Sequence, residues 1–123
     1  MVAPHLWAGR QSERFACRWL VRHGLKLITG NYQCRTGELD LIMDDGGSLA
    51  IVEVRYRRSL AYGGALASVS PAKRKRIMQA TQDFIHHHPA YRHWALRFDV
   101  LALTGSLRAP EITWRQRAFT ADN

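Results

Sequence analysis

The sequence contains few cysteines, few acidic residues and no long apolar run, and each shortage excludes a class of protein. The spacing of its two cysteines, Cys17 and Cys34, fits no zinc ribbon and no redox motif. They indicate reduced thiols of a cytoplasmic protein, with a structural disulfide as the alternative. No apolar run approaches the roughly 20 residues that span a bilayer, and residues 1–10 lack the apolar segment and cleavage site of a secretory signal. We therefore expect a soluble cytoplasmic protein with no membrane partner.

The length and the apolar content predict a single domain that spans residues 1–123. A chain of 123 residues has room for one compact domain and not for a second. Its apolar fraction of 46% is ordinary for a globular protein and argues against disorder. A domain of this size can bury a core without disulfides or a structural metal.

The charge balance is strongly basic and rests on arginine. Eighteen lysines and arginines stand against ten acids, which gives a net charge of +8, and only Lys26, Lys73 and Lys75 are lysines. The arginine guanidinium presents a rigid fork of donors that matches phosphate geometry. A small domain this basic is typical of proteins that bind nucleic acid. A basic protein whose charge serves only solubility is the alternative.

Apolar spacing and turn residues predict a helix, three strands, a second helix and at least one further strand. Ser70 and Pro71 have the pattern of an N-cap followed by proline at the first helical position, and Gly24 and Pro89 mark helix ends. The predicted helices cover residues 11–23 and 71–87; the predicted strands cover 25–32, 38–44, 49–55 and 94–103, with a short final strand over 111–115. Residues 57–68 are expected to form a mobile loop. This order suits an α/β or α+β sandwich in which helices cover a sheet.

The register of the central hairpin can be predicted from side-chain alternation. One face of each strand is apolar, formed by Leu39, Leu41 and Met43 on the first strand and by Ala50, Val52 and Val54 on the second. Pairing Leu41 with Val52 turns both sets toward one core and fits a short turn at the two glycines 46 and 47. The same register places Asp40 directly opposite Glu53 on the other face.

This opposed carboxylate pair predicts a site for a hard divalent cation. Directly opposed residues have Cβ atoms about 4.5–5.5 Å apart, and two ionised carboxylates so close repel each other unless a cation lies between them. Mg²⁺ takes one or two protein carboxylates and keeps several waters. The alternative is an exposed face with a salt bridge from Arg55 to one acid. Ile42 and Ile51 on the same face indicate that a helix covers it.

Two residues from the predicted helices can reach this face. Glu13 lies beside the apolar stripe of the first helix, so its carboxylate is expected to point toward the sheet; a rim residue paired with an arginine is the alternative. Lys73 lies in the first turn of the second helix at the edge of its apolar side. Its alternative is a solvated member of the basic run 73–76.

Three segments of the chain carry a family resemblance. Gly37-Glu38-Leu39-Asp40-Leu41-Ile42, Val52-Glu53-Val54-Arg55-Tyr56-Arg57 and Arg97-Phe98-Asp99-Val100 closely resemble the YraN-type family of uncharacterised bacterial proteins, uncharacterised protein family 0102. The match extends from about Gly9 to Phe119. That family resembles the archaeal Holliday junction resolvases of the PD-(D/E)xK nuclease superfamily. The resemblance implies an α/β fold with a restriction-endonuclease-like core, in the order helix, three strands, helix, strand, and a mixed sheet flanked by helices.

The resemblance also implies roles for individual residues. Asp40 and Glu53 would be ligands of Mg²⁺ or Mn²⁺, with the Val54 carbonyl as a third protein ligand and Glu13 completing the metal site. The implied chemistry is hydrolysis of a phosphodiester by a metal-activated water. Arg55 occupies the position of the superfamily's lysine, and Lys73 matches a basic residue at the start of the helix after the hairpin.

Arg55 is a departure from the family pattern that divides the functional hypotheses. Arginine stays protonated and cannot serve as a base, although it can orient water or stabilise a charged phosphate. The three acids favour the leading hypothesis, a metal-dependent endonuclease for DNA, including branched or junction DNA. One alternative is a nucleic-acid-binding module that has lost useful catalysis, and another is an RNA- or ribosome-associated protein.

The expected partner is nucleic acid, and DNA is preferred over RNA. We expect phosphate contacts from the basic residues Arg35, Arg57, Arg58, Lys73, Arg74 and Lys75. Because resolvases work as symmetric pairs, the resemblance also suggests a homodimer.

Overall fold

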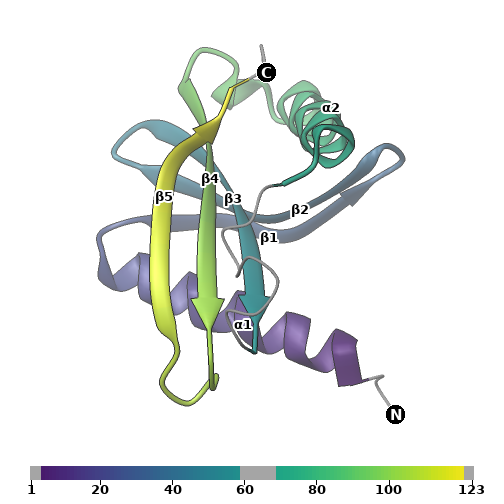
Figure 1. The fold of residues 1–123 in the computed structure, drawn as a ribbon. Helices are drawn as coiled ribbons and strands as arrows, with labels where there is room; N and C mark the ends of the chain where they lie inside the picture. Colours follow the sequence, from purple (N-terminus) through teal and green to yellow (C-terminus); the bar gives the residue numbers. More distant parts are fainter. Residues whose placement is uncertain (1–3, 59–68, 121–123) are drawn as a thin grey trace.

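The computed structural model describes the backbone of residues 4–58 and 69–120, and side chains from Gly9 onward. Its elements are α1 (Pro4–Arg22), β1 (Lys26–Cys34), β2 (Gly37–Asp45), β3 (Ser48–Arg57), α2 (Pro71–His87), the 3-10 helix η2 (Pro89–Tyr91), β4 (Ala95–Thr104) and β5 (Glu111–Phe119), as Figure 1 shows. Most of the predicted loop 57–68 lies outside the described residues. Neither described helix has the length and hydropathy needed to cross a membrane.

The strands form one mixed sheet in the order β1-β2-β3-β4-β5. β3 and β4 are parallel, and the other neighbouring pairs are antiparallel. α2 lies between the two parallel strands in the chain, as a crossover connection requires. The fold is therefore α/β with a restriction-endonuclease-like core, as predicted.

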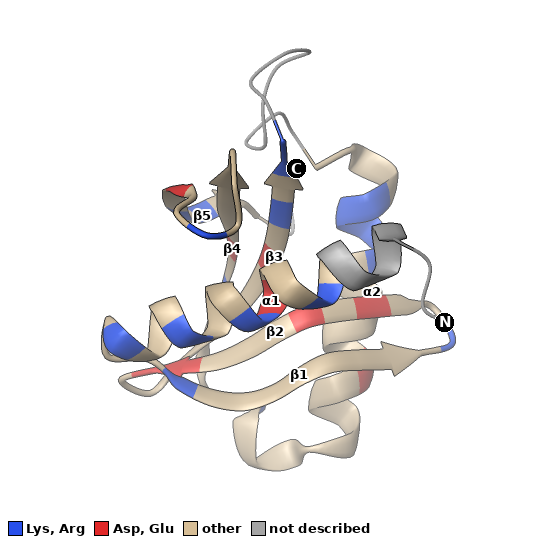
Figure 2. Cartoon of the chain, turned by 90° about the horizontal axis from the view of Figure 1, so that it is seen from below, with Lys and Arg blue, Asp and Glu red and all other residues tan. Residues whose placement is uncertain are grey.

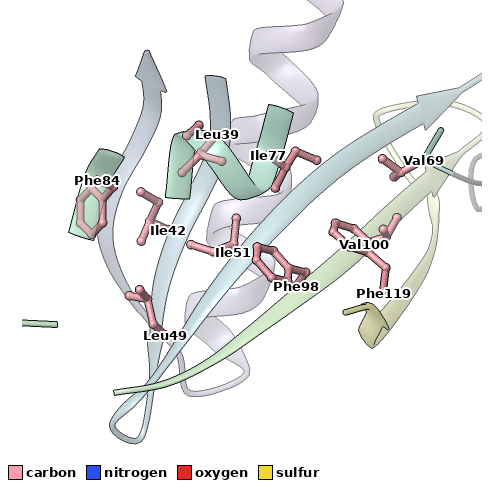
Figure 3. Packing of buried hydrophobic residues seen from close by; sticks show 11 residues of the cluster. Leu39, Ile42, Leu49, Ile51, Val69, Ile77, Phe84, Phe98, Val100 and Phe119 are labelled. Atoms are coloured by element: carbon pink, nitrogen blue, oxygen red, sulfur yellow. The ribbon is translucent and has the colours of Figure 1, made fainter. Parts of the chain in front are cut away.

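The two helices cover opposite faces of the sheet. Ile77 and Phe84 of α2 pack against a cluster that contains Ile42 and Ile51 (Figure 3). On the other face, Ala16 and Leu20 of α1 pack against another cluster, which includes Leu41, Met43, Ala50 and Val52. Ile42 and Ile51 were predicted on the charged face of the hairpin, because successive strand residues point to opposite faces. Their packing under α2 shows that a helix covers this face, as predicted.

Backbone capping sets the helix boundaries nearest the candidate site. The Ser70 side chain accepts a hydrogen bond from the Lys73 N–H at 3.2 Å, with proline at the first helical position, as predicted. α1 ends in a Schellman motif: Leu25 N–H donates to Leu20 C=O, Gly24 N–H donates to Val21 C=O, and Gly24 has φ +96°. α1 begins at Pro4, seven residues before the predicted start.

The hairpin register is as predicted from the Leu41–Val52 pair to the turn, but the predicted pair of Asp40 and Glu53 is not part of the ladder, and Leu39 lies on the other face. Leu41 pairs with Val52 and Ile42 with Ile51. Leu39 was expected beside Leu41 and instead packs in the cluster under α2. The expectation assumed regular alternation, whereas the β2–β3 pairing ends at Leu41 and the Val54 N–H donates to the Asp40 carboxylate. β2 therefore leaves β3 at Asp40.

The last strand is longer than the short strand predicted over 111–115, since β5 continues to Phe119. Its pairing with β4 shifts between Phe98 and Val100, and Arg117 has φ +53°. A β-bulge of this kind re-aims the strand and resumes the ladder, which ordinary alternation does not reveal.

Candidate functional site

Asp40 lies where β2 separates from β3. Its Oδ2 accepts a hydrogen bond from the Val54 N–H at 2.9 Å. Burial raises the pKa of Asp40 to about 7, the Val54 hydrogen bond opposes this, and the neighbouring Glu13 raises it further. In an extended strand the N–H and C=O of one residue point to the same edge, so the Val54 carbonyl also faces the gap beside Asp40.

Glu53 is nearly inaccessible, with 5% of its surface exposed. Its Oε1 lies 2.6 Å from the Lys73 Nζ at the start of α2. Burial raises the pKa of Glu53 to about 7 and the Asp40 charge adds to this, while Lys73 lowers it. The ion pair thus offsets only part of the cost of burying this carboxylate.

Glu13 brings a third carboxyl group, from α1. Burial raises its pKa, and a side-chain hydrogen bond with Asp40 lowers it. The Asp40 charge in turn raises the pKa of Glu53, so these two carboxyl groups also lie close together. The structure therefore places Glu13, Asp40 and Glu53 in a connected row drawn from three elements. We call these three residues the carboxyl row. In Figure 2, α1 crosses acidic segments of the sheet.

The carboxyl row offers oxygen ligands of the kind that a divalent cation binds. Among the residues that the structure describes, no three His, Cys, Asp or Glu side chains converge as a ready-made metal cage. Mg²⁺ and Mn²⁺ do not require one, because they are held by one or two carboxylates and by water. Asp40 and Glu53 fit that requirement: Glu53 is buried and Asp40 is half-buried, their charges repel each other, and each carboxylate has one oxygen that neither Val54 nor Lys73 occupies.

The two basic residues expected here behave differently. Lys73 is 35% exposed at its side chain and pairs with Glu53, so it is not a freely solvated member of the basic run. Arg55 makes no ion pair with either acid among the described residues, and its buried Nε has no hydrogen-bond partner there. The alternative reading of the sequence was a salt bridge from Arg55 to one of the acids. The structure has a salt bridge to Glu53, but its cation is Lys73.

An open groove leads to the carboxyl row. It has a volume of about 400 Å³, and its lining includes Arg10, Glu13 and Arg14 of α1, with Asn31 of β1 and Asp40 of β2. The groove gives a ligand access to Glu13 and Asp40 from the side of α1. Sequence reasoning missed Arg10 and Arg14, although their four-residue spacing along a helix was available as a signal.

Of the six residues predicted to contact nucleic acid, four are exposed and two are held by contacts within the fold. Arg35, Arg57, Arg58 and Lys75 are exposed, and none of them makes an ion pair with another described residue. Arg74 instead donates from Nε to Val69 C=O at 2.9 Å and lies 5.4 Å from the Phe119 ring centroid. Arg74 is therefore anchored to the fold, and Lys73 is held by Glu53.

The third resemblance segment builds a separate buried network. Asp99 is fully buried and accepts hydrogen bonds from Arg97 Nε, from the Trp114 indole and from the Arg117 N–H. Arg97 Nη1 also lies 2.7 Å from Asp45, at the β2–β3 turn. These contacts tie the hairpin to β4 and β5, and none of them reaches the carboxyl row.

Comparison with known proteins gives the family. The family model described as uncharacterised protein family UPF0102 matches residues 12–103. A UPF0102 protein of Nitrosococcus oceani is 40% identical over 98% of both chains. One of Alcanivorax borkumensis is 43% identical over 93% of this chain and 92% of its own, and one of Alkalilimnicola ehrlichii is 44% identical over 97% and 91%. The chain belongs to the uncharacterised protein family UPF0102.

Proposed function

We propose that the protein is a metal-dependent endonuclease that hydrolyses phosphodiesters of DNA, branched DNA included. The observation that carries the proposal is the carboxyl row, of which Glu13 and Asp40 line an open groove and Glu53 is paired with Lys73. Asp40 and Glu53 both have pKa values raised to about 7 by burial and by their neighbours. Strongly shifted carboxyl groups beside a cleft are a mark of functional sites.

Asp40 and Glu53 would hold Mg²⁺ or Mn²⁺, with Glu13 next to Asp40. Such an ion, when bound, lowers the pKa of a bound water and offsets the charge that builds on the phosphate. The residues of the chain supply the rest. Glu13 has a raised pKa and borders the groove, so it is placed to take a proton at its carboxylate.

Lys73 and Arg55 supply positive charge. The Lys73 ammonium holds the Glu53 carboxylate in place at 2.6 Å and adds a charge that attracts phosphate. Arg55 cannot give up its proton, so its contribution is electrostatic. Its buried Nε has no partner among the described residues, which leaves a donor for a ligand oxygen or an ordered water.

Cleavage assays with defined DNA substrates test the proposal. Purified protein is incubated with linear, flapped and four-way DNA in Mn²⁺ and in Mg²⁺, beside Asp40→Asn and the matched surface control Glu111→Gln. Glu111 is exposed at the start of β5, so its loss leaves the site intact. We expect cleavage by the wild type and by the control and none by Asp40→Asn. Equal cleavage by all three would show a contaminating nuclease and contradict the proposal.

A second candidate is a nucleic-acid-binding module without catalysis. The observation in its favour is that Lys73 already neutralises Glu53 without a metal, while Arg55 replaces a residue able to act as a base. The same assay separates the two candidates. DNA binding by both the wild type and Asp40→Asn, with no cleavage by either in any metal, supports the module.

A further inference from the structure

Four arginines follow the exposed side of α1 at intervals of four residues: Arg10, Arg14, Arg18 and Arg22. We call them the arginine row. Side chains four residues apart are neighbours on a helix, and a rise of 1.5 Å per residue makes the row about 18 Å long. Because a turn takes 3.6 residues, the row winds slowly about the helix axis. Figure 2 shows these basic segments recurring along α1.

The arginine row forms no ion pairs with the described acidic side chains of the protein. Among the described side chains, none of the four arginines makes an ion pair within 4.0 Å. The acid of α1, Glu13, belongs to the carboxyl row; the Arg10 charge lowers its pKa, but the two form no ion pair within 4.0 Å. A line of exposed guanidinium groups without acidic partners is complementary to a line of phosphates.

Two hollows place the arginine row relative to the candidate site. Arg10 and Arg14 line the groove of about 400 Å³ that contains Glu13 and Asp40. Arg14 and Arg18 line a second hollow of about 200 Å³, beside Leu107. Arg14 therefore lies between the two. The row begins at the carboxyl row and leads away from it toward the end of α1.

The composition of α1 favours double-stranded DNA as the occupant. Single strands are bound by aromatic side chains on which bases stack. Among the side chains of α1 that are described, from Gly9 onward, Phe15 and Trp19 pack against the core cluster. Phe15 also lines the second hollow, and Trp19 stacks on His23 with the ring centroids 3.7 Å apart. Ala16 and Leu20 are covered by the sheet, so the part of α1 with described side chains, from Gly9 onward, has no broad apolar side free for a membrane. What remains for a ligand is contact with a phosphate backbone.

We propose that the arginine row holds the phosphate backbone of a DNA duplex arm that extends from the carboxyl row along α1. This inference rests on the proposed function for its orientation, since the scissile phosphate is placed at the groove. At 3.4 Å per phosphate along one strand, about 18 Å corresponds to about five phosphates. The contacts would be independent of base sequence.

Salt-dependent binding tests the row without any cleavage. The wild type, Arg14→Gln/Arg18→Gln and the control pair Arg92→Gln/Arg115→Gln are titrated with a labelled 20-base-pair duplex in EDTA, from about 50 to 200 mM salt. Both pairs remove two exposed arginines, but Arg92 follows η2 and Arg115 lies on β5. Log affinity falls with log salt, and each lost phosphate contact makes this negative slope shallower by about 0.9. We expect the slope of the α1 pair to become shallower by about 1.8 and that of the control pair to stay unchanged.

Three results would overturn the inference. Equal losses in both pairs would show an effect of net charge alone. An unchanged slope in the α1 pair would show that the row makes no phosphate contacts. Tighter, α1-dependent binding to the single strand or to an RNA duplex of the same length would assign the row to another ligand. Because no metal is present, a failure to cleave DNA counts against the proposed function and leaves this binding test decisive for the row.

Discussion

At the scale of single residues, Glu53 carries a charge that the fold accommodates poorly. Its carboxylate is 5% exposed, it faces Asp40, and its pKa stays raised to about 7 despite the Lys73 ammonium at 2.6 Å. Each pKa unit corresponds to about 1.4 kcal/mol between the two protonation states. Because ionising Glu53 beside Asp40 costs free energy in the folded protein, a further cation bound between the two carboxylates would be stabilising.

The first prediction concerns the stability of Asp40→Asn without metal. A carboxyl group with a raised folded-state pKa stabilises the fold fully below its unfolded pKa near 4 and loses that contribution as the pH rises through about 7. Asparagine keeps an oxygen for the Val54 N–H and carries no charge. In EDTA, we expect Asp40→Asn to exceed the wild type in unfolding free energy at pH 8 by about 1–3 kcal/mol, with little difference at pH 4. Urea unfolding at both pH values measures this, and a pH-independent difference would contradict it.

The second prediction concerns Arg55→Lys. A lysine in a buried, charged site can lose its proton and act as a base, whereas arginine cannot. General base catalysis typically contributes about 10²–10⁴-fold, so we expect cleavage in Mn²⁺ to rise at least about tenfold. Rates on a four-way junction at several pH values measure this. Arg57→Lys, an exposed change of the same chemistry two residues on, is the control. A slower Arg55→Lys would show that the guanidinium itself is required.

At the scale of elements, the site depends on where α2 starts. Ser70 caps the helix through the N–H of Lys73, the residue whose ammonium reaches Glu53. The cap therefore sets both the first turn of α2 and the base of the Lys73 side chain. β2 contributes in another way, since its departure from β3 lets the Val54 N–H reach Asp40.

The third prediction tests that cap. Ser70→Ala removes the oxygen that satisfies the Lys73 N–H, which costs about 1 kcal/mol at a typical N-cap. We expect that loss in urea unfolding, together with weaker activity on DNA because Lys73 is held less firmly. Ser70→Asn preserves a capping oxygen and serves as the control. Equal stability of Ser70→Ala and the wild type would show that the cap contributes nothing.

The elements also show how far sequence reasoning reached. The start of α2, the end of α1 and the Leu41–Val52 register follow from local signals: an N-cap before a proline, a glycine with positive φ, and alternation. The position of Leu39 was wrong because the β2–β3 pairing ends where Asp40 takes a backbone donor. The Lys73–Glu53 contact joins residues 20 positions apart through the crossover, and no local spacing encodes it.

At the scale of the whole molecule, the sheet and its two helices bring acidic and basic side chains together. α1 supplies Glu13 and the arginine row, α2 supplies Lys73, and the strands between them supply Asp40 and Glu53. A net charge of +8 surrounds this small acidic centre. Such a field draws phosphate toward the molecule while the acids remain available to a cation.

The last prediction links the cation, protons and folding in the intact chain. Mg²⁺ or Mn²⁺ binds carboxylates in their ionised form, so protons compete with it until the pH exceeds the raised pKa values of about 7. A ligand at about 100 times its Kd adds about 2.7 kcal/mol to the unfolding free energy. We therefore expect the metal to raise the melting temperature clearly at pH 8, weakly at pH 5.5, and at neither pH in Asp40→Asn. Glu111→Gln should behave as the wild type. A shift of equal size at both pH values, or one that persists in Asp40→Asn, would place the cation elsewhere on the molecule, because the raised pKa values of Asp40 and Glu53 couple binding at this site to protons in this range.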